Sequence, residues 1–327
     1  MRASGKRQVH ALFAVVLALA GMAGCASDGS NESSPAPSST EATTTTTTIP
    51  GMRPSSGCGE PGDAAGPTTT TVVPLATTIA GEQRSAVISA EGVSSERPSP
   101  VVVLLHGMGQ NAQVIDTNSD FPAQAEKSGV IVITPNAVGS PTMWRPSGDG
   151  PDADYISWLI DEVSGAYCVD ESRVYLAGFS VGAAMATAYA CAHQDRIAAV
   201  ATVAVQFPGS CEQPMPIIGF HGSADPIVPF AAGAEGAVGG GAGTLANMAT
   251  WAQVAGCDAE PVESEAAAKV TEFDWPNCDN GAEVRLYRVD GGVHAWPGTP
   301  GGGDAVPPEQ SVDATALSLS FFARHHS

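Results

Sequence analysis

The sequence predicts an α/β fold, with a mostly parallel central sheet and helices on both faces. Apolar runs alternate with helix-compatible segments through most of the chain, which is the pattern of parallel sheets. Several runs, such as Val101–Leu105, are continuously apolar, as expected of strands buried on both faces. Ser180, Asp225 and His294 each follow such a run, and the carboxyl ends of parallel strands are where α/β sheets bind ligands.

The individual elements follow in chain order. Two short runs, 70–76 and 85–90, have β-type patterning and predict an edge hairpin closed near Gly81. The remaining apolar runs predict strands at 101–105, 130–134, 174–177, 197–205, 216–220 and 284–289. Helical spacing or composition predicts helices at 121–127, 152–166, 181–191, 245–254 and 311–325. The glycine-rich stretch Gly233–Gly243 is expected to be a flexible surface insertion, because it lacks the strand-turn-helix setting of a nucleotide-binding loop.

The N-terminal region has the composition of an export and tethering segment. A basic start, an apolar run too short to span a membrane and small residues before Cys25 predict a lipoprotein signal peptide over residues 1–25. The alternative is an ordinary signal peptide in which Cys25 is incidental. Residues 26–57 are rich in Ser, Thr and Pro and predict a disordered stalk, since they cannot bury a core. Residues 58–327 are then expected to form one large α/β domain.

Charge and cysteine content narrow the function classes. The 327-residue chain has a formal net charge of −20 without a basic patch, which argues against nucleic acid as a partner. Six cysteines follow Cys25, and an even number in an exported chain favours disulfides. We prefer a bond between Cys257 and Cys278, which flank one loop, while the other four cysteines leave three pairings open. No C-x-x-C motif occurs and the histidines are not clustered with cysteines, so we expect no metal site such as a zinc site. The serine chemistry described below requires no cofactor, and none is expected.

The segment Arg173–Ala186 carries the candidate nucleophile. Its motif Gly178-Phe179-Ser180-Val181-Gly182 matches G-x-S-x-G between a predicted strand and a predicted helix. A sharp strand-to-helix turn of this kind exposes the serine hydroxyl at the top of a sheet. Without that setting, a chance match in a chain rich in small residues would be the simpler interpretation.

A serine hydroxyl needs a base and an acid to become an effective nucleophile. The sequence offers Asp225 after one strand and His294 after the last strand, in the order serine, acid, histidine. Asp290 is a rival acid, but it lies very close to His294 in the sequence. His221 ends a strand and is expected to make hydrogen bonds within its loop.

The developing oxyanion of ester hydrolysis needs hydrogen-bond donors. We expect one from the backbone N–H of Val181, directly after the nucleophile. The other is expected from Met108 N–H in the loop after Val101–Leu105. His106, in the same loop, is expected to be structural.

Together these motifs resemble the feruloyl esterase and polyhydroxybutyrate depolymerase family of α/β-hydrolases. The matching segments occur in the family's order and are VVVLLHGMGQNA, YCVDESRVYLAGFSVGAAMA, IIGFHGSADPIVPF and GGVHAWPG. The signal segment and threonine-rich stalk resemble actinobacterial lipoprotein members. The resemblance implies the α/β-hydrolase fold, a secreted serine esterase and the catalytic triad Ser180, Asp225 and His294. It further implies that the cysteines from Cys168 to Cys278 belong to a disulfide framework.

Substrate choice is less determined. Many relatives have a second glycine where this chain has Ala183, and the segment Ala231–Gly243 is unusually glycine-rich. Family members act on feruloylated or acetylated polysaccharides, polyhydroxybutyrate-type oligomers or small esters. Trp296, which closely follows His294, and Trp144 are our candidate substrate-binding residues.

Two other functions remain open from the sequence. One is a carbohydrate- or lipid-binding lipoprotein that retains the scaffold without activity, although all parts of the triad are present. The other is an acyltransferase or peptidase, because sequence does not separate hydrolysis from transfer. In each case we expect an extracytoplasmic protein, secreted or held at the cell surface by a lipid on Cys25.

Overall fold

The computed structural model describes residues 51–59, 75–208, 210–233, 242–299 and 312–327. These residues all belong to one compact unit, Thr48–Ser327. The predicted signal peptide, Cys25, most of the predicted stalk and most of the glycine-rich insertion lie outside the described residues. Within those ranges no helix has both the length and the apolar character needed to cross a membrane.

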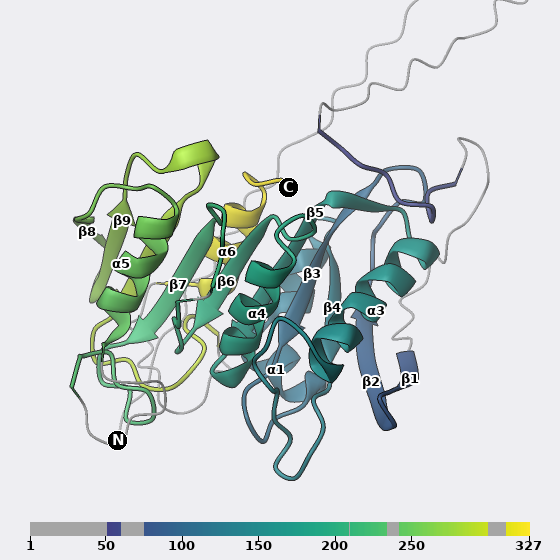
Figure 1. The fold of residues 1–327 in the computed structure, drawn as a ribbon, viewed down its shortest axis with the longest axis horizontal. Helices are drawn as coiled ribbons and strands as arrows, with labels where there is room; N and C mark the ends of the chain where they lie inside the picture. The colour runs from purple at the N-terminus through teal and green to yellow at the C-terminus, as the bar shows by residue number, and fades with distance from the viewer. Residues whose placement is uncertain (1–50, 60–74, 209, 234–241, 300–311) are drawn as a thin grey trace, which may run out of the picture. The chain divides into compact units, whose positions relative to one another are not determined.

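The described residues form a ten-stranded, mostly parallel sheet with the order β1-β2-β4-β3-β5-β6-β7-β10-β9-β8 (Figure 1). The six central strands, from β4 to β10, pair in parallel, and the two outer strands on each side pair antiparallel. The bounds are β1 Leu75–Ile79, β2 Glu82–Ser89, β3 Ser99–Leu105, β4 Ile131–Pro135, β5 Val169–Phe179, β6 Ala199–Val203, β7 Ile217–Gly222, β8 Val262–Ala267, β9 Val270–Trp275 and β10 Val284–Val289. The predicted fold class is therefore confirmed, and the carboxyl ends of the six central strands share one edge of the sheet.

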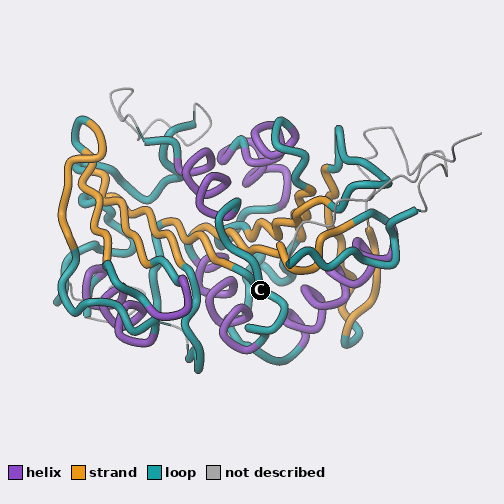
Figure 2. The backbone as a smooth tube through the Cα atoms, turned by 90° about the horizontal axis from the view of Figure 1, so that it is seen from above, coloured by secondary structure: helices purple, strands orange, loops and turns teal. Residues whose placement is uncertain are grey.

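Helices cover both faces of the sheet (Figure 2). They are α1 Ala112–Ser119, α2 Phe121–Glu126, α3 Pro151–Ala166, α4 Val181–Ala192, α5 Thr244–Val254 and α6 Ala314–Phe322. Buried residues of α3, α4 and α5 join one hydrophobic cluster with the sheet, whereas those of α1, α2 and α6 join a second cluster. Because the central strands are apolar on both faces, each face can bury a helical layer.

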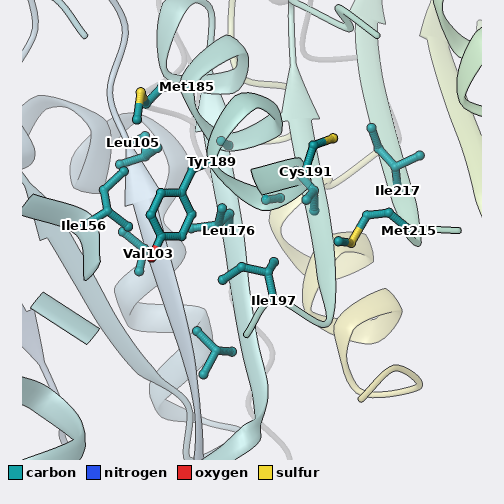
Figure 3. Packing of buried hydrophobic residues seen from close by; sticks show 14 of the residues in the cluster. Val103, Leu105, Ile156, Leu176, Met185, Tyr189, Cys191, Ile197, Met215 and Ile217 are labelled. Atoms are coloured by element: carbon teal, nitrogen blue, oxygen red, sulfur yellow. The ribbon is translucent and has the colours of Figure 1, made fainter. Parts of the chain in front are cut away.

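The first cluster packs the helix after Ser180 onto the centre of the sheet. Tyr189 and Met185 of α4 pack in the same buried cluster as Ile156 of α3 and the strand residues Leu105 and Leu176 (Figure 3). All five of these side chains are fully buried. This packing holds α4 in place directly behind the turn that carries Ser180.

The outer strands differ from the sequence expectation. The first hairpin closes at Ala80-Gly81, as predicted, because both residues have positive φ. A second antiparallel hairpin, β8–β9, was missed, since its strands alternate weakly and β8 is almost fully exposed. The predicted loop between Cys257 and Cys278 is in fact this hairpin.

Three disulfides settle the cysteine pairing. They are Cys58–Cys168, Cys191–Cys211 and Cys257–Cys278. The last is the pair preferred from the sequence, and the first two choose among the pairings left open. Their presence is consistent with an exported protein.

The last residues of the predicted stalk are packed against the domain, which corrects that boundary. Arg53 N–H donates to Asp170 Oδ1 at 3.0 Å, and Pro54 pairs with Asp170 in an antiparallel bridge. Ser55 N–H donates to Val169 O at 2.9 Å, three residues before Cys58. Hydrogen bonds to β5, together with burial of the Ser55 side chain, order a segment whose composition alone indicated disorder.

Candidate active site

The predicted nucleophile lies at a strained turn between β5 and α4. Ser180 has φ 54° and ψ −122°, a conformation that non-glycine residues rarely adopt. A Cβ on Gly178 would lie 2.4 Å from Gly182 O, and a Cβ on Gly182 would lie 2.2 Å from Leu105 O. Both glycines are therefore required for β3, β5 and α4 to approach closely enough for the turn to form.

Residues from three separate loops form one hydrogen-bonded chain. Ser180 Oγ lies 3.0 Å from His294 Nε2, and His294 Nδ1 lies 2.7 Å from Asp225 Oδ2. Ionised Asp225 can only accept, so Nδ1 carries the proton and Nε2 is free to accept from the serine hydroxyl. Asp290 instead pairs with Arg288 Nε at 2.8 Å, so the structure favours Asp225 over this rival.

Asp225 is held in its charged form. Burial would raise its pKa, but hydrogen bonds from His221, His294 and the N–H groups of Val228 and Ile227 outweigh burial and hold the pKa well below its usual range. The two backbone donors reach Asp225 Oδ1 at 2.9 and 2.8 Å. The second carboxylate oxygen, Oδ2, orients His294 at 2.7 Å and also lies 3.5 Å from His221 Nε2.

The acid loop and the histidine loop are joined directly. Ala224 N–H donates to Gly292 O at 2.9 Å, and Gly291 N–H donates to Ser223 Oγ at 2.8 Å. The Phe179 ring, next to the nucleophile, lies 5.0 Å from the His294 ring. These contacts restrict the imidazole to the position between Ser180 and Asp225.

The two predicted oxyanion donors lie in the loop after β3 and at the first residue of α4. Val181 is the first residue of α4, so its N–H has no intrahelical acceptor and is available to a ligand. The Met108 loop is braced on both sides of Met108. Gly107 N–H donates to Gln110 Oε1 at 3.0 Å, and Gly109 N–H donates to Thr142 O at 2.8 Å.

His106 supports the same loop from beneath, as expected of a structural residue. Its Nε2 accepts from Ala137 N–H at 3.0 Å, so Nδ1 carries the proton and donates to Gly107 O at 2.7 Å. Burial lowers the pKa of His106, which agrees with this neutral form. The carbonyl of His106 accepts from Trp144 Nε1 at 3.1 Å.

The two predicted substrate-binding tryptophans are corrected by the structure. Trp144 is fully buried and its indole N–H is bonded to His106. Trp296 is also buried, and its N–H donates to Thr315 Oγ1 at 3.0 Å. Neither ring has a face open to a substrate; both are anchors that hold site loops to the core.

Sequence reasoning missed the apolar side chains that are exposed near the site. Met108 and Ile227 are 58% and 53% exposed, and they belong to the oxyanion loop and the acid loop, respectively. Their positions in loops that follow two buried strands could have indicated from the sequence that they lie at the edge of the sheet where the site forms.

Among the described residues no group of three or more His, Cys, Asp or Glu side chains is placed to hold a metal ion.

Comparisons with known proteins agree with this geometry. Residues 84–229 match the family model described as "Esterase PHB depolymerase". "Putative esterase NocK" from Nocardia uniformis subsp. tsuyamanensis is 30% identical over 250 residues, which are 67% of this chain and 72% of that protein. The chain belongs to the esterase PHB depolymerase family. It is thus a carboxylic-ester hydrolase, as the sequence predicted.

This esterase is also similar to one part of a longer relative and, in its fold, to a solved structure. "Feruloyl esterase B" from Piromyces equi is 28% identical over 221 residues, covering 62% of the chain but 41% of that protein. The solved acetyl xylan esterase from Aspergillus awamori has a TM-score of 0.53 at 16% identity, covering 73% of this chain and 94% of that one. At this identity the structural likeness supports the α/β-hydrolase fold.

Proposed function

We propose that the protein is an extracytoplasmic serine esterase that works through an acyl-enzyme. The observation that carries this proposal is the hydrogen-bonded chain from Ser180 through His294 to Asp225, with contacts of 3.0 and 2.7 Å. These distances are within the range expected of a nucleophile, its base and the group that orients the base.

Acylation begins when His294 Nε2 takes the hydroxyl proton of Ser180. The serine oxygen then forms a bond to the ester carbonyl carbon, and the carbonyl oxygen becomes an oxyanion. Collapse of this intermediate breaks the bond to the alcohol oxygen, which receives the proton from His294. Asp225 stabilises the imidazolium that exists between these two proton transfers.

Deacylation repeats the sequence with water. His294 takes a proton from water, whose oxygen attacks the acyl carbon of the ester on Ser180. When the second intermediate collapses, the serine oxygen leaves with the proton from His294 and the carboxylic acid is released. The N–H groups of Val181 and Met108 are proposed to stabilise both oxyanions, and losing one such donor typically costs about 3–4 kcal/mol.

The exposed side chains support an ester with an apolar or aromatic acyl group. Met108 and Ile227 are exposed in the loops after β3 and β7, and we propose that an acyl group attached to Ser180 contacts them. Feruloyl esters of polysaccharides fit this requirement, and feruloyl esterases are among the relatives. Acetyl esters and hydroxybutyrate oligomers are the competing substrates. We expect Ile227→Ala to lower kcat/KM for methyl ferulate more than for an activated acetate ester.

The cellular location is proposed from the N-terminal segment. Lipidation of Cys25 would anchor the enzyme to the membrane surface through several acyl chains. Three disulfides support an oxidising compartment outside the cytoplasm. Labelled fatty acid should be incorporated into the parent protein but not into a Cys25→Ser variant. Incorporation into both proteins, or into neither, would show that Cys25 does not carry the lipid.

The catalytic proposal is tested by comparing the parent, Ser180→Ala and the control Ser264→Ala. Ser264 lies on the exposed outer strand β8. The substrates are methyl ferulate, acetylated xylan, hydroxybutyrate oligomers and p-nitrophenyl acetate. We expect Ser180→Ala to lose at least about a thousandfold in kcat and Ser264→Ala to lose nothing.

The other outcomes separate the alternatives. A folded parent that cleaves none of the four esters would refute the catalytic proposal and favour a binding lipoprotein. Formation of new esters when acceptor alcohols are added, with little free acid, would identify an acyltransferase.

A further inference from the structure

A second histidine lies beneath the proposed triad. His221 is the next-to-last residue of strand β7, is 1% exposed and lies four residues before Asp225. Its Nε2 is 3.5 Å from Asp225 Oδ2, the same oxygen that contacts His294. The sequence motif His221-Gly222-Ser223-Ala224-Asp225 brings the two side chains together at the end of one strand.

The environment of Nδ1 requires a proton on this nitrogen. Gln206 Oε1 lies 2.6 Å from His221 Nδ1. The amide of Gln206 has one favourable orientation, because its Nε2 faces the carbonyl oxygens of Phe220 and Thr202 at 3.1 and 3.3 Å. A flipped amide would place Oε1 against two acceptors, so Oε1 faces the histidine and Nδ1 must donate.

The environment of Nε2 requires a proton as well. Val228 O lies 2.8 Å from this nitrogen, and a carbonyl oxygen can only accept. The nearby Asp225 Oδ2 is also an acceptor. An imidazole with N–H groups at both nitrogens is an imidazolium, so the hydrogen-bond geometry assigns a positive charge to His221.

The charges around His221 favour this assignment. Asp225 is the carboxylate in ion-pair contact with it, and the Thr244 hydroxyl of α5 lies 3.0 Å from Nδ1. Arg288, on the neighbouring strand β10, is screened by the Phe230 ring, over which it lies at 6.0 Å, and it is paired with Asp290. His294 contacts the same oxygen of Asp225 through its Nδ1 at 2.7 Å.

We propose that His221 is a protonated positioning residue that sets the acid side of the pH range of this esterase. This inference rests on the proposed triad. Asp225 is shared between two imidazoles, and the fixed charge of His221 weakens the attraction between Asp225 and a proton on His294. Loss of the charge on His221 is therefore expected to narrow the pH range of activity on its acid side.

The protonation state is tested by NMR on the full, oxidised chain labelled with 15N at its seven histidines. At neutral pH we expect both ring nitrogens of His221 to have imidazolium chemical shifts and both ring protons to exchange slowly. His221→Gln identifies these signals by their loss. The same signals should persist in Ser180→Ala, which has no nucleophile, so this measurement does not depend on activity.

The functional consequence is tested by pH profiles of kcat/KM for p-nitrophenyl acetate. His221→Gln removes the charge, and Gln206→Met removes the acceptor at Nδ1 without altering Asp225 or His221. Both variants should move the acid limb to higher pH by about one unit, because the opposite charge within a few ångströms of Asp225 is lost. Thr244→Val is the matched control, since it leaves both obligatory acceptors in place and should not move the limb.

The outcomes distinguish this inference from the proposed function. A neutral ring for His221 in the NMR spectrum, or unchanged acid limbs in both His221→Gln and Gln206→Met, would overturn it. If the parent hydrolyses no ester but has an imidazolium at His221, the esterase mechanism and the proposed effect of His221 on its pH dependence are both rejected. The assignment of a positive charge to His221 would still stand. If either variant fails to fold, the NMR result on the parent decides, with the His221 ring signals assigned through bonds from its own backbone resonances.

Discussion

The close approach of α4 to β3 makes Gly182 the most informative position to perturb. In Gly182→Ala the added Cβ would lie 2.2 Å from Leu105 O and 2.6 Å from His106 O. Reaching an ordinary contact of 3.4 Å requires a displacement of about 1.2 Å, and both obstacles are backbone atoms that cannot rotate away. The displaced backbone leads directly into the loop with the proposed oxyanion donor Met108.

The displacement sets the expected magnitudes. Overpacking of this kind typically costs about 1–3 kcal/mol of stability. A misplacement of about 1 Å in a catalytic group typically lowers the rate roughly a hundredfold. Gly182→Ala should therefore unfold at lower urea concentration and lose about two orders of magnitude in kcat for p-nitrophenyl acetate, with a smaller change in KM.

Gly165→Ala provides a matched control. Gly165 lies in the last turn of α3, is exposed, and an added Cβ would meet nothing within 4 Å. This substitution should leave kcat unchanged and stabilise the protein by about 0.5–1 kcal/mol. If Gly182→Ala kept kcat within about threefold of the parent and unfolded at the same urea concentration, the argument from close approach would be refuted.

Three further predictions concern stability and specificity. Replacing Cys58 and Cys168 by serines should lower the free energy of unfolding in urea by about 4.8 kcal/mol, and replacing Cys257 and Cys278 should lower it by about 3.3 kcal/mol. The costs differ because the two disulfides close loops of 110 and 21 residues. Equal costs for the two pairs would contradict this argument from loop length. Burial raises the pKa of Asp116 to about 6, so the folded state favours its protonated form and loses stability as pH rises from about 4 through 6. Asp116→Asn should therefore be more stable than the parent at pH 7.5 by up to about 3 kcal/mol and should show no gain at pH 4. Urea unfolding at the two pH values measures this difference in stability. An equal difference between variant and parent at both pH values would count against the prediction. Trp144→Phe should lower stability by about 1–3 kcal/mol, since His106 O loses its donor, but leave the ratio of kcat/KM for methyl ferulate and p-nitrophenyl acetate unchanged; a change in that ratio would restore Trp144 as a substrate contact.

The sequence by itself determined the features that depend on short segments and on their order along the chain. Continuous apolar runs predicted the central parallel strands, because strands covered on both faces have no polar side. The elbow motif predicted the turn at Ser180, because few residues other than glycine fit where strand and helix meet. The order of Ser180, Asp225 and His294 predicted which loops meet, since parallel strands open at one edge of the sheet.

Tertiary structure decided the features that depend on what lies nearby in space. Trp144 and Trp296 are adjacent to site residues in the sequence, yet their rings are buried because loops around the site also need anchors in the core. Arg53 and Ser55 are ordered by hydrogen bonds to β5, which composition does not encode. The charge assigned to His221 depends on the orientation of Gln206, fifteen residues away. A protonation state follows from the donors and acceptors that surround a ring, and only the folded chain brings these together.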